Sequence, residues 1–101
     1  MQTYNKLVRD KIPDILDQKG IKYEKRIADD AEFKIELIKK LDEEVKEFME
    51  AGSPEELADV LEVINSLKEL PDYKYVEEIR KQKFIERGGF DKKIILKGEK
   101  D

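Results

Sequence analysis

Apolar residues recur at helical spacing through the middle of the chain. Between Asp29 and Gly52 they fall three or four positions apart and form one stripe, made of Phe33, Leu37, Ile38, Leu41, Val45 and Phe48. Such spacing places all of them on one face of a helix. Asp29 or Asp30 can begin the helix as an N-cap, and Gly52 can end it. We therefore predict a long amphipathic helix between these residues.

The segment after Gly52 carries a strong helix start. Ser53 can act as N-cap, Pro54 falls at the first helical position, and Glu56 stands three residues after the cap, which is the order typical of helix N-termini. This helix is predicted to run to the break at Pro71, with apolar residues at Leu57, Val60, Leu61, Ile64 and Leu67. A further helix is predicted through Val76, Ile79 and Phe84, ending at Gly88-Gly89.

The two ends of the chain carry shorter elements. Asp10 can cap a short helix that has Pro13 in its first turn and ends at Gly20. Residues 21–27 alternate between apolar and polar, which favours a short strand, and residues 94–96 form an apolar run that could pair with it. The prediction is a single domain over residues 1–101, an all-α bundle with a minor pair of short β-strands.

Composition narrows the choice of partners. The chain has 101 residues, of which 39% are hydrophobic and 46% charged. So small a domain has a thin core, and we expect part of its apolar surface to be covered by another subunit. The net charge of -4 argues against binding a nucleic-acid polymer, which requires a basic face.

Missing residue types also limit the chemistry. The chain has no cysteine and no histidine, which excludes disulfides, thiolate nucleophiles, histidine bases and ordinary zinc sites. Any catalysis must use carboxylates, amines, guanidiniums or hydroxyls. No apolar run approaches the roughly 20 residues of a membrane span, and residues 1–10 are charged and lack a signal-peptide core. We therefore expect a cytoplasmic protein that does not enter a membrane.

Four acidic residues are placed symmetrically around the turn near Gly52. Glu44 and Glu47 are three positions apart on one helix, and Glu56 and Asp59 are three apart on the next, so each pair shares a face. In an antiparallel hairpin with packed axes roughly 8–10 Å apart, the four carboxylates form a rough quadrilateral. Carboxylates without a cation would repel one another, and Mg²⁺ binds such oxygens together with substrate phosphates.

Two simpler interpretations stay open at this point. Acidic pairs three apart also occur elsewhere in this Glu-rich chain, for example Asp14 with Asp17, where they need only solvate a helix. Glu56 has a further alternative role as the capping-box residue for Ser53.

The acidic residues resemble the motif of a known superfamily. Glu43-Glu44-Val45-Lys46-Glu47 followed by Glu56-Leu57-Ala58-Asp59-Val60 is similar to the Glu-Glu-x-x-Glu and Glu-x-x-Asp motifs of the MazG-like, all-α nucleotide pyrophosphohydrolases. Residues 4–13 and 83–90 look like a subgroup described as phosphoribosyl-ATP pyrophosphohydrolase-like. The resemblance thus covers three blocks of the chain.

This resemblance implies a Mg²⁺-dependent enzyme, with Mn²⁺ as a possible substitute, that hydrolyses a nucleoside triphosphate to the monophosphate and pyrophosphate. It assigns Glu44, Glu47, Glu56 and Asp59 as metal ligands and Glu43 as the base that orients or deprotonates water. For Glu43 a solvated charge on the helix surface is the alternative. It also implies a homodimer or tetramer, because one helical hairpin supplies only half of a four-helix bundle.

Basic residues are candidates for holding the substrate phosphates. Lys83 and Arg87 match a Lys-Phe-x-x-Arg pattern seen in relatives, and Lys6 and Arg9 are weaker candidates, since ammonium and guanidinium groups suit phosphate oxygens. For each of them a surface ion pair is the alternative.

Two other functions compete with the general triphosphate hydrolase. The first is phosphoribosyl-ATP pyrophosphohydrolase of histidine biosynthesis, which performs the same chemistry on another nucleotide. The second is a non-catalytic helical interaction module, for which the amphipathic helices would serve equally well. Such a module should be indifferent to Mg²⁺.

Overall fold

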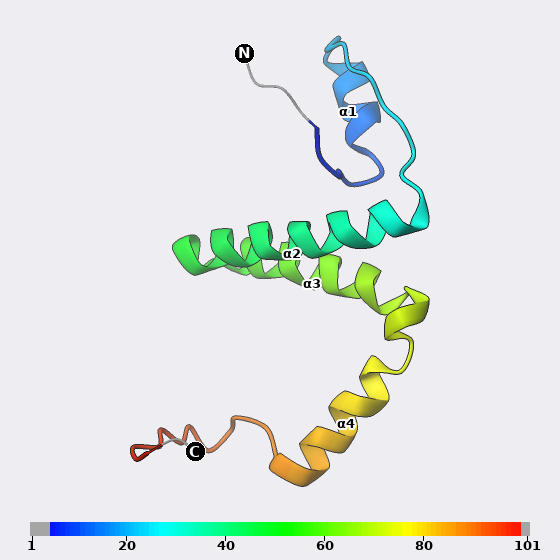
Figure 1. Cartoon of the computed structure of the whole chain (residues 1–101). Coiled ribbons are helices and arrows are strands. Elements are labelled where there is room, and N and C mark those ends of the chain that lie inside the picture. The colour runs from blue at the N-terminus through cyan, green and yellow to red at the C-terminus, as the bar shows by residue number, and fades with distance from the viewer. Residues whose placement is uncertain (1–4, 100–101) are drawn as a thin grey trace.

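The computed structural model describes residues 5–99, and over this range the protein is all-helical, as predicted (Figure 1). Tyr4, the first residue of the N-terminal motif, lies outside it. The elements are α1 (Ile12–Gln18), α2 (Asp30–Ala51), α3 (Pro54–Lys68), the short 3-10 helix η1 (Pro71–Tyr73) and α4 (Val76–Arg87). None of these helices combines the length and the apolar character needed to cross a bilayer.

Local signals set the ends of the two central helices. The side chain of Asp29 accepts a hydrogen bond from the Glu32 amide at 2.8 Å and begins α2. Gly52 ends it in the left-handed conformation, with φ of 64°. Ser53 then caps α3, because its Oγ accepts a hydrogen bond from the Glu56 amide at 3.3 Å. The predicted starts and stops are confirmed here, and only Gly52 and Ser53 separate the two helices.

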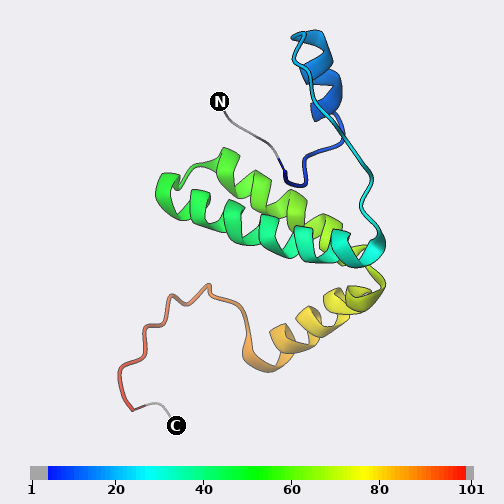
Figure 2. The same ribbon diagram turned by 45° about the horizontal axis from the view of Figure 1, so that its top comes forward.

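The core lies between α2 and α3. The two helices run antiparallel, side by side in both views (Figures 1 and 2), and they form the main helix–helix contact of the described chain. Its buried hydrophobic side chains are Leu37 from α2 and Val60 and Val63 from α3, each less than a tenth exposed. The core is as thin as the composition predicted.

The rest of the chain extends away from this hairpin. In Figure 1 α1 lies on one side of it and α4 leads off on the other. The radius of gyration is 18.1 Å, against about 13 Å for a compact domain of this length. The accessible surface is 9841 Å², against about 6,000 Å² for a compact protein of this mass. Much of the apolar surface therefore has no cover within one chain.

The predicted β-strands are wrong for residues 5–99. Residues 21–29 and 93–97 have no regular secondary structure. The first segment joins α1 to α2 and the second follows α4, so they lie on opposite sides of the hairpin (Figure 1). A strand needs a neighbour to accept and donate its ladder hydrogen bonds, and neither segment has one in the described chain.

The predicted cap of the first helix is also displaced. Helix α1 begins at Ile12 with Lys11 in the N-cap position and no side-chain cap. Asp10 stands one residue too early, in a turn in which the Ile12 amide donates to the Arg9 carbonyl at 3.1 Å. The predicted stop at Gly20 is correct, because this glycine has φ of 69°.

Candidate functional site

Three of the four symmetric carboxylates meet across the hairpin. Glu44 on α2 and Glu56 and Asp59 on α3 each offer an oxygen, and these oxygens lie within 4.8 Å of one another. Glu56 and Asp59 share a face of α3 because they are three residues apart. The short turn at Gly52 fixes the register that brings Glu44 opposite them. We refer to Glu44, Glu56 and Asp59 as the acidic triad.

Two oxygens of the triad are buried without a partner. Glu44 is only 7% exposed. Its Oε2 and the Oε2 of Glu56 have no hydrogen-bond partner among the described residues. Burial of a polar atom without a partner costs free energy, and such atoms are rare in folded proteins. A cation bound by the triad would give such oxygens a partner.

The environment of Glu44 disfavours its charge. Burial raises the pKa of its carboxyl, and the negative charges of Glu47 and Asp59 raise it further. The ammonium of Lys40, with Nζ 3.5 Å from Oε1, opposes the effect without cancelling it. Positive charge added beside Glu44 therefore favours the ionised form, which is the form that binds a metal.

Glu47, the fourth predicted ligand, lies outside the triad. Its side chain is exposed on α2, and it acts on Glu44 through its charge. Glu47 and Glu44 are three residues apart on the same helix and therefore lie on the same side of it.

The predicted base Glu43 lies between two ammonium groups. Lys6 Nζ is 3.3 Å from its Oε1, and Lys40 Nζ is 3.7 Å from its Oε2. Its side chain is 37% exposed and therefore accessible to water. Sequence reasoning did not single out Lys40, although its spacing of four residues from Glu44 is a recognised ion-pair signal on helices.

The N-terminal segment reaches the same site. Arg9 Nη2 donates to Asp59 Oδ1 at 3.0 Å, across 50 residues of sequence. With Lys6 and Lys40, the site holds three basic side chains beside the five carboxylates of the triad, Glu43 and Glu47. When all eight of these described side chains are charged, their net charge is −2, which one divalent cation would neutralise.

The other basic candidates are placed elsewhere. Lys83 and Arg87 are exposed on α4, which leads away from the hairpin in both views (Figures 1 and 2). Within one described chain they do not join the triad. Of the basic residues considered for phosphate binding, the structure brings together Lys6 and Arg9.

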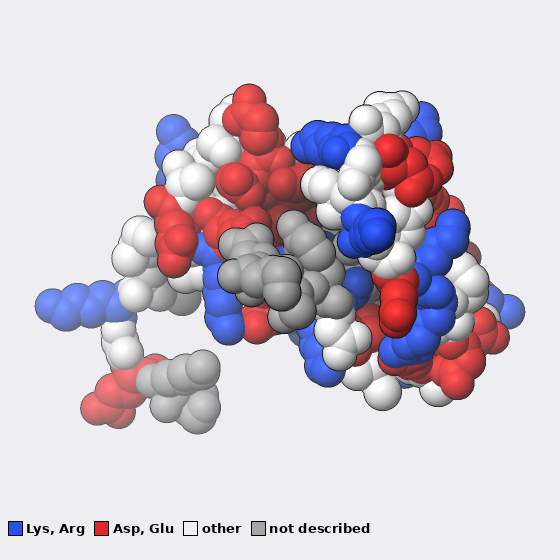
Figure 3. All heavy atoms as spheres, turned by 90° about the horizontal axis from the view of Figure 1, so that it is seen from above, with Lys and Arg blue, Asp and Glu red and all other residues white. Residues whose placement is uncertain are grey.

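Two hollows in the described surface lie away from the triad. One, of about 650 Å³, lies beside Asp17 and Tyr23, and the other, of about 230 Å³, lies beside Phe90 and Leu96. Figure 3 shows acidic atoms massed over one part of the face seen from above, with basic groups spread around them.

The donor set of the triad fits a hard divalent cation. Carboxylate oxygens are the ligands that Mg²⁺ prefers, and neighbouring oxygens of its octahedral shell stand about 3.0 Å apart. The triad oxygens lie within 4.8 Å of one another, so their side chains would draw closer together around a bound ion. Comparison with models of protein families, with curated proteins and with solved structures found no match to this chain.

Proposed function

We propose that the protein is a Mg²⁺-dependent nucleotide pyrophosphohydrolase that cleaves a nucleoside triphosphate into the monophosphate and pyrophosphate. The observation that carries the proposal is the pair of buried, unpartnered oxygens on Glu44 and Glu56, with Asp59 beside them. A structural role accounts poorly for this arrangement, because an apolar pair would fill the same place at lower cost. The motif resemblance gives the reaction class.

The residues of the site have distinct tasks in this proposal. Glu44, Glu56 and Asp59 hold the cation, and Glu47 turns in to complete the set. Bound Mg²⁺ would lower the pKa of a water molecule and offset charge on the phosphates. Glu43, next to Glu44 and open to solvent, orients this water or accepts its proton.

Phosphate binding is assigned first to Lys6 and Arg9, because they already lie at the acidic residues. Lys83 and Arg87 contribute only if a second copy brings its α4 to the hairpin. We propose such a homodimer, or a tetramer of the same chains. Its support is the uncovered apolar surface, which includes Phe84 at 58% and Ile85 at 76% exposed on α4.

Phosphoribosyl-ATP is the alternative substrate. Its support is the resemblance of the N-terminal block, and the chemistry at the triad would be the same. The non-catalytic module is the remaining alternative, supported by the same apolar helix faces. It predicts no response to Mg²⁺ and no nucleotide cleavage.

The test is pyrophosphate release from ribo- and deoxynucleoside triphosphates and from phosphoribosyl-ATP, with Mg²⁺ present. Glu44→Gln should lower release by at least about 100-fold, since it removes a metal ligand. Glu69→Gln is the matched control, because Glu69 is an exposed acid at the C-terminal end of α3, ten residues or about 15 Å beyond Asp59, and should leave the rate unchanged. Equal rates for wild type and Glu44→Gln would contradict the site, and no release from any nucleotide would favour the non-catalytic module.

A further inference from the structure

The segment from Asn5 to Asp10, here called the basic strap, crosses to the hairpin from the N-terminal side. Two ion pairs hold it there: Lys6 to Glu43 at 3.3 Å and Arg9 to Asp59 at 3.0 Å. The members of these pairs are 37 and 50 residues apart in sequence. The apolar side chain of Val8 in the same segment is 36% exposed. Leu7 in the same segment is half-buried, so packing and charge together determine where the strap lies.

Asp59 takes part in two arrangements at once. It belongs to the acidic triad, and its Oδ1 is also the acceptor for Arg9. A divalent cation bound to the triad would neutralise most of the charge that attracts the guanidinium. The two positive groups would also repel each other at this distance. Arg9 and a cation on Asp59 are thus in competition.

We propose that Arg9 and a divalent cation are alternative partners of Asp59, and that cation binding releases the Arg9 end of the basic strap from the hairpin. This inference rests on the proposed metal site. Without a cation, Arg9 serves as a substitute counter-ion that limits repulsion among the carboxylates. After exchange, the released guanidinium remains tethered beside the site.

The energetics permit this exchange. The Arg9 and Asp59 side chains are 58% and 43% exposed, and ion pairs of this exposure are weak because water screens them. Such a pair should reduce cation affinity by only about two- to fivefold. A cation held by the whole triad overcomes a competitor of this strength.

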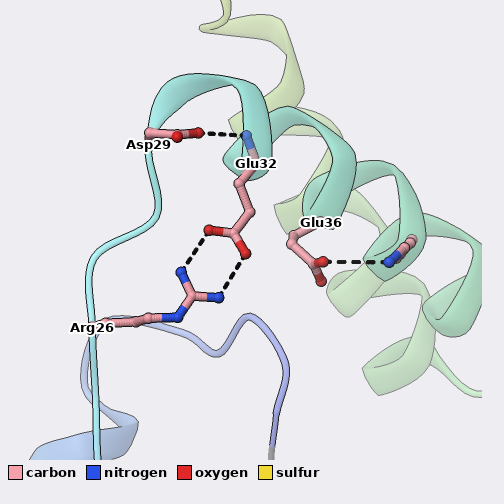
Figure 4. A network of polar contacts seen from close by, with 5 residues as sticks. Arg26, Asp29, Glu32 and Glu36 are labelled. Atoms are coloured by element: carbon pink, nitrogen blue, oxygen red, sulfur yellow. Dashed lines mark hydrogen bonds and ion pairs between the residues drawn. The ribbon is translucent and has the colours of Figure 1, made fainter.

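The test measures Mn²⁺ affinity, by electron paramagnetic resonance or calorimetry, for wild type, Arg9→Gln and Arg26→Gln. Arg26 provides a matched control: it donates two hydrogen bonds of 2.6 Å to Glu32 near the start of α2 (Figure 4). Glu32 and Glu44 are twelve positions apart on this helix, or about 18 Å along its axis. Both substitutions remove one positive charge, but only Arg9 touches the triad.

We expect Arg9→Gln to bind Mn²⁺ about two- to fivefold more tightly than wild type, with Arg26→Gln unchanged. Equal or weaker binding by Arg9→Gln would overturn the exchange. So would equal tightening in both variants, because that result reports net charge alone.

A second measurement follows the wild-type strap directly. In a Mg²⁺ titration monitored by NMR, the Arg9 Nε–Hε signal should shift with the same midpoint as metal binding, while that of Arg26 stays still. A bound metal with an unmoved Arg9 signal contradicts the proposal. If wild type and both variants fail to bind Mn²⁺ at millimolar concentration, the proposed metal site is wrong, and the proposed exchange is wrong with it. If Mn²⁺ binds but Arg9→Gln leaves its affinity unchanged, only the exchange is contradicted.

Discussion

The α2–α3 hairpin and α4 are both amphipathic, yet they end in different surroundings. All the buried hydrophobic side chains of the described chain belong to the hairpin, namely Leu37, Val60 and Val63. Helix α4 buries none of its residues, and its apolar Ile79 and Phe84 are more than half exposed. The hairpin thus finds its partner within the chain, whereas α4 presents its apolar residues to solvent.

This difference shows that an apolar stripe indicates that a helix needs a packing partner. It does not indicate whether that partner is another segment of the same chain or a second subunit. In the hairpin a two-residue connection forces the stripes of α2 and α3 together. Helix α4 is separated from α3 by the η1 segment, which turns it away (Figure 2). Its exposed residues support the proposed second copy, because contiguous apolar surface on a monomer usually marks an interaction site.

The sharpest test of the comparison truncates one side chain in each region. Leu37→Ala should lower the free energy of unfolding by about 3 kcal/mol, because it opens a cavity in the core. Ile85→Ala, at a residue 76% exposed, should change it by less than about 0.5 kcal/mol in dilute, monomeric protein. Urea denaturation measures both values. A similar loss for the two variants would show that α4 is packed within the single chain.

Measurements of self-association test whether a second copy of the chain packs against α4. Phe84→Asp should weaken the affinity of self-association by at least about tenfold, because a charge replaces an apolar side chain that the second copy would bury. Gln82→Asp, two residues away on α4 and therefore on another face, is the control and should have little effect. Analytical ultracentrifugation over a range of concentrations measures the change. A wild type that stays monomeric throughout would contradict the shared bundle.

Removal of the Ser53 cap between α2 and α3 should have a smaller effect on stability, because this cap acts only within the hairpin. Ser53→Ala should lower the free energy of unfolding by about 1 kcal/mol, since the Glu56 amide loses its acceptor. Ser53→Thr keeps a hydroxyl oxygen and should restore most of the loss. Helix α4 has no side-chain cap at its N-terminus and offers no equivalent to remove. An unchanged denaturation midpoint for Ser53→Ala would show that this cap does not support the hairpin.

The buried acid of the hairpin should make stability depend on pH in the absence of metal. Since burial raises the pKa of Glu44 in the folded state, the folded protein holds this proton more tightly than the unfolded chain. The stabilisation that protonated Glu44 contributes to the fold is fully present below the ordinary carboxyl pKa, about 4.3. It is lost as the pH rises through the raised pKa of the folded state.

Glu44→Gln removes this dependence. Without metal, its melting temperature at neutral pH should exceed that of wild type by up to about 4 °C, and the two curves should converge as the pH falls toward the ordinary carboxyl pKa. Mg²⁺ should reverse the order, because the ion stabilises only the protein that binds it. Melting curves that differ by the same amount at every pH would show that ionisation of Glu44 does not destabilise the fold.

Much of the fold could be read from local signals. The caps at Asp29 and Ser53 and the stop at Gly52 act through hydrogen bonds and backbone angles within a few residues, so the sequence contains all that is needed to place them. The strand predictions failed for the opposite reason. The alternation in residues 21–27 describes a surface that suits a sheet, but a strand exists only beside another strand.

The candidate site divides in the same way. Symmetry around Gly52 was enough to predict that Glu44, Glu56 and Asp59 face one another, because a short turn leaves little freedom of register. It was not enough to separate buried Glu44 from exposed Glu47, which depends on small rotations of α2 against α3.

Helix boundaries, the hairpin and the facing carboxylates were therefore determined by the sequence itself, through interactions that span a few residues or one tight turn. Tertiary structure alone decided that Arg9 reaches Asp59 across 50 residues, and that Lys83 and Arg87 lie away from the acidic triad. Long connections permit many arrangements, and the choice among them follows from the summed packing and charge of the whole chain.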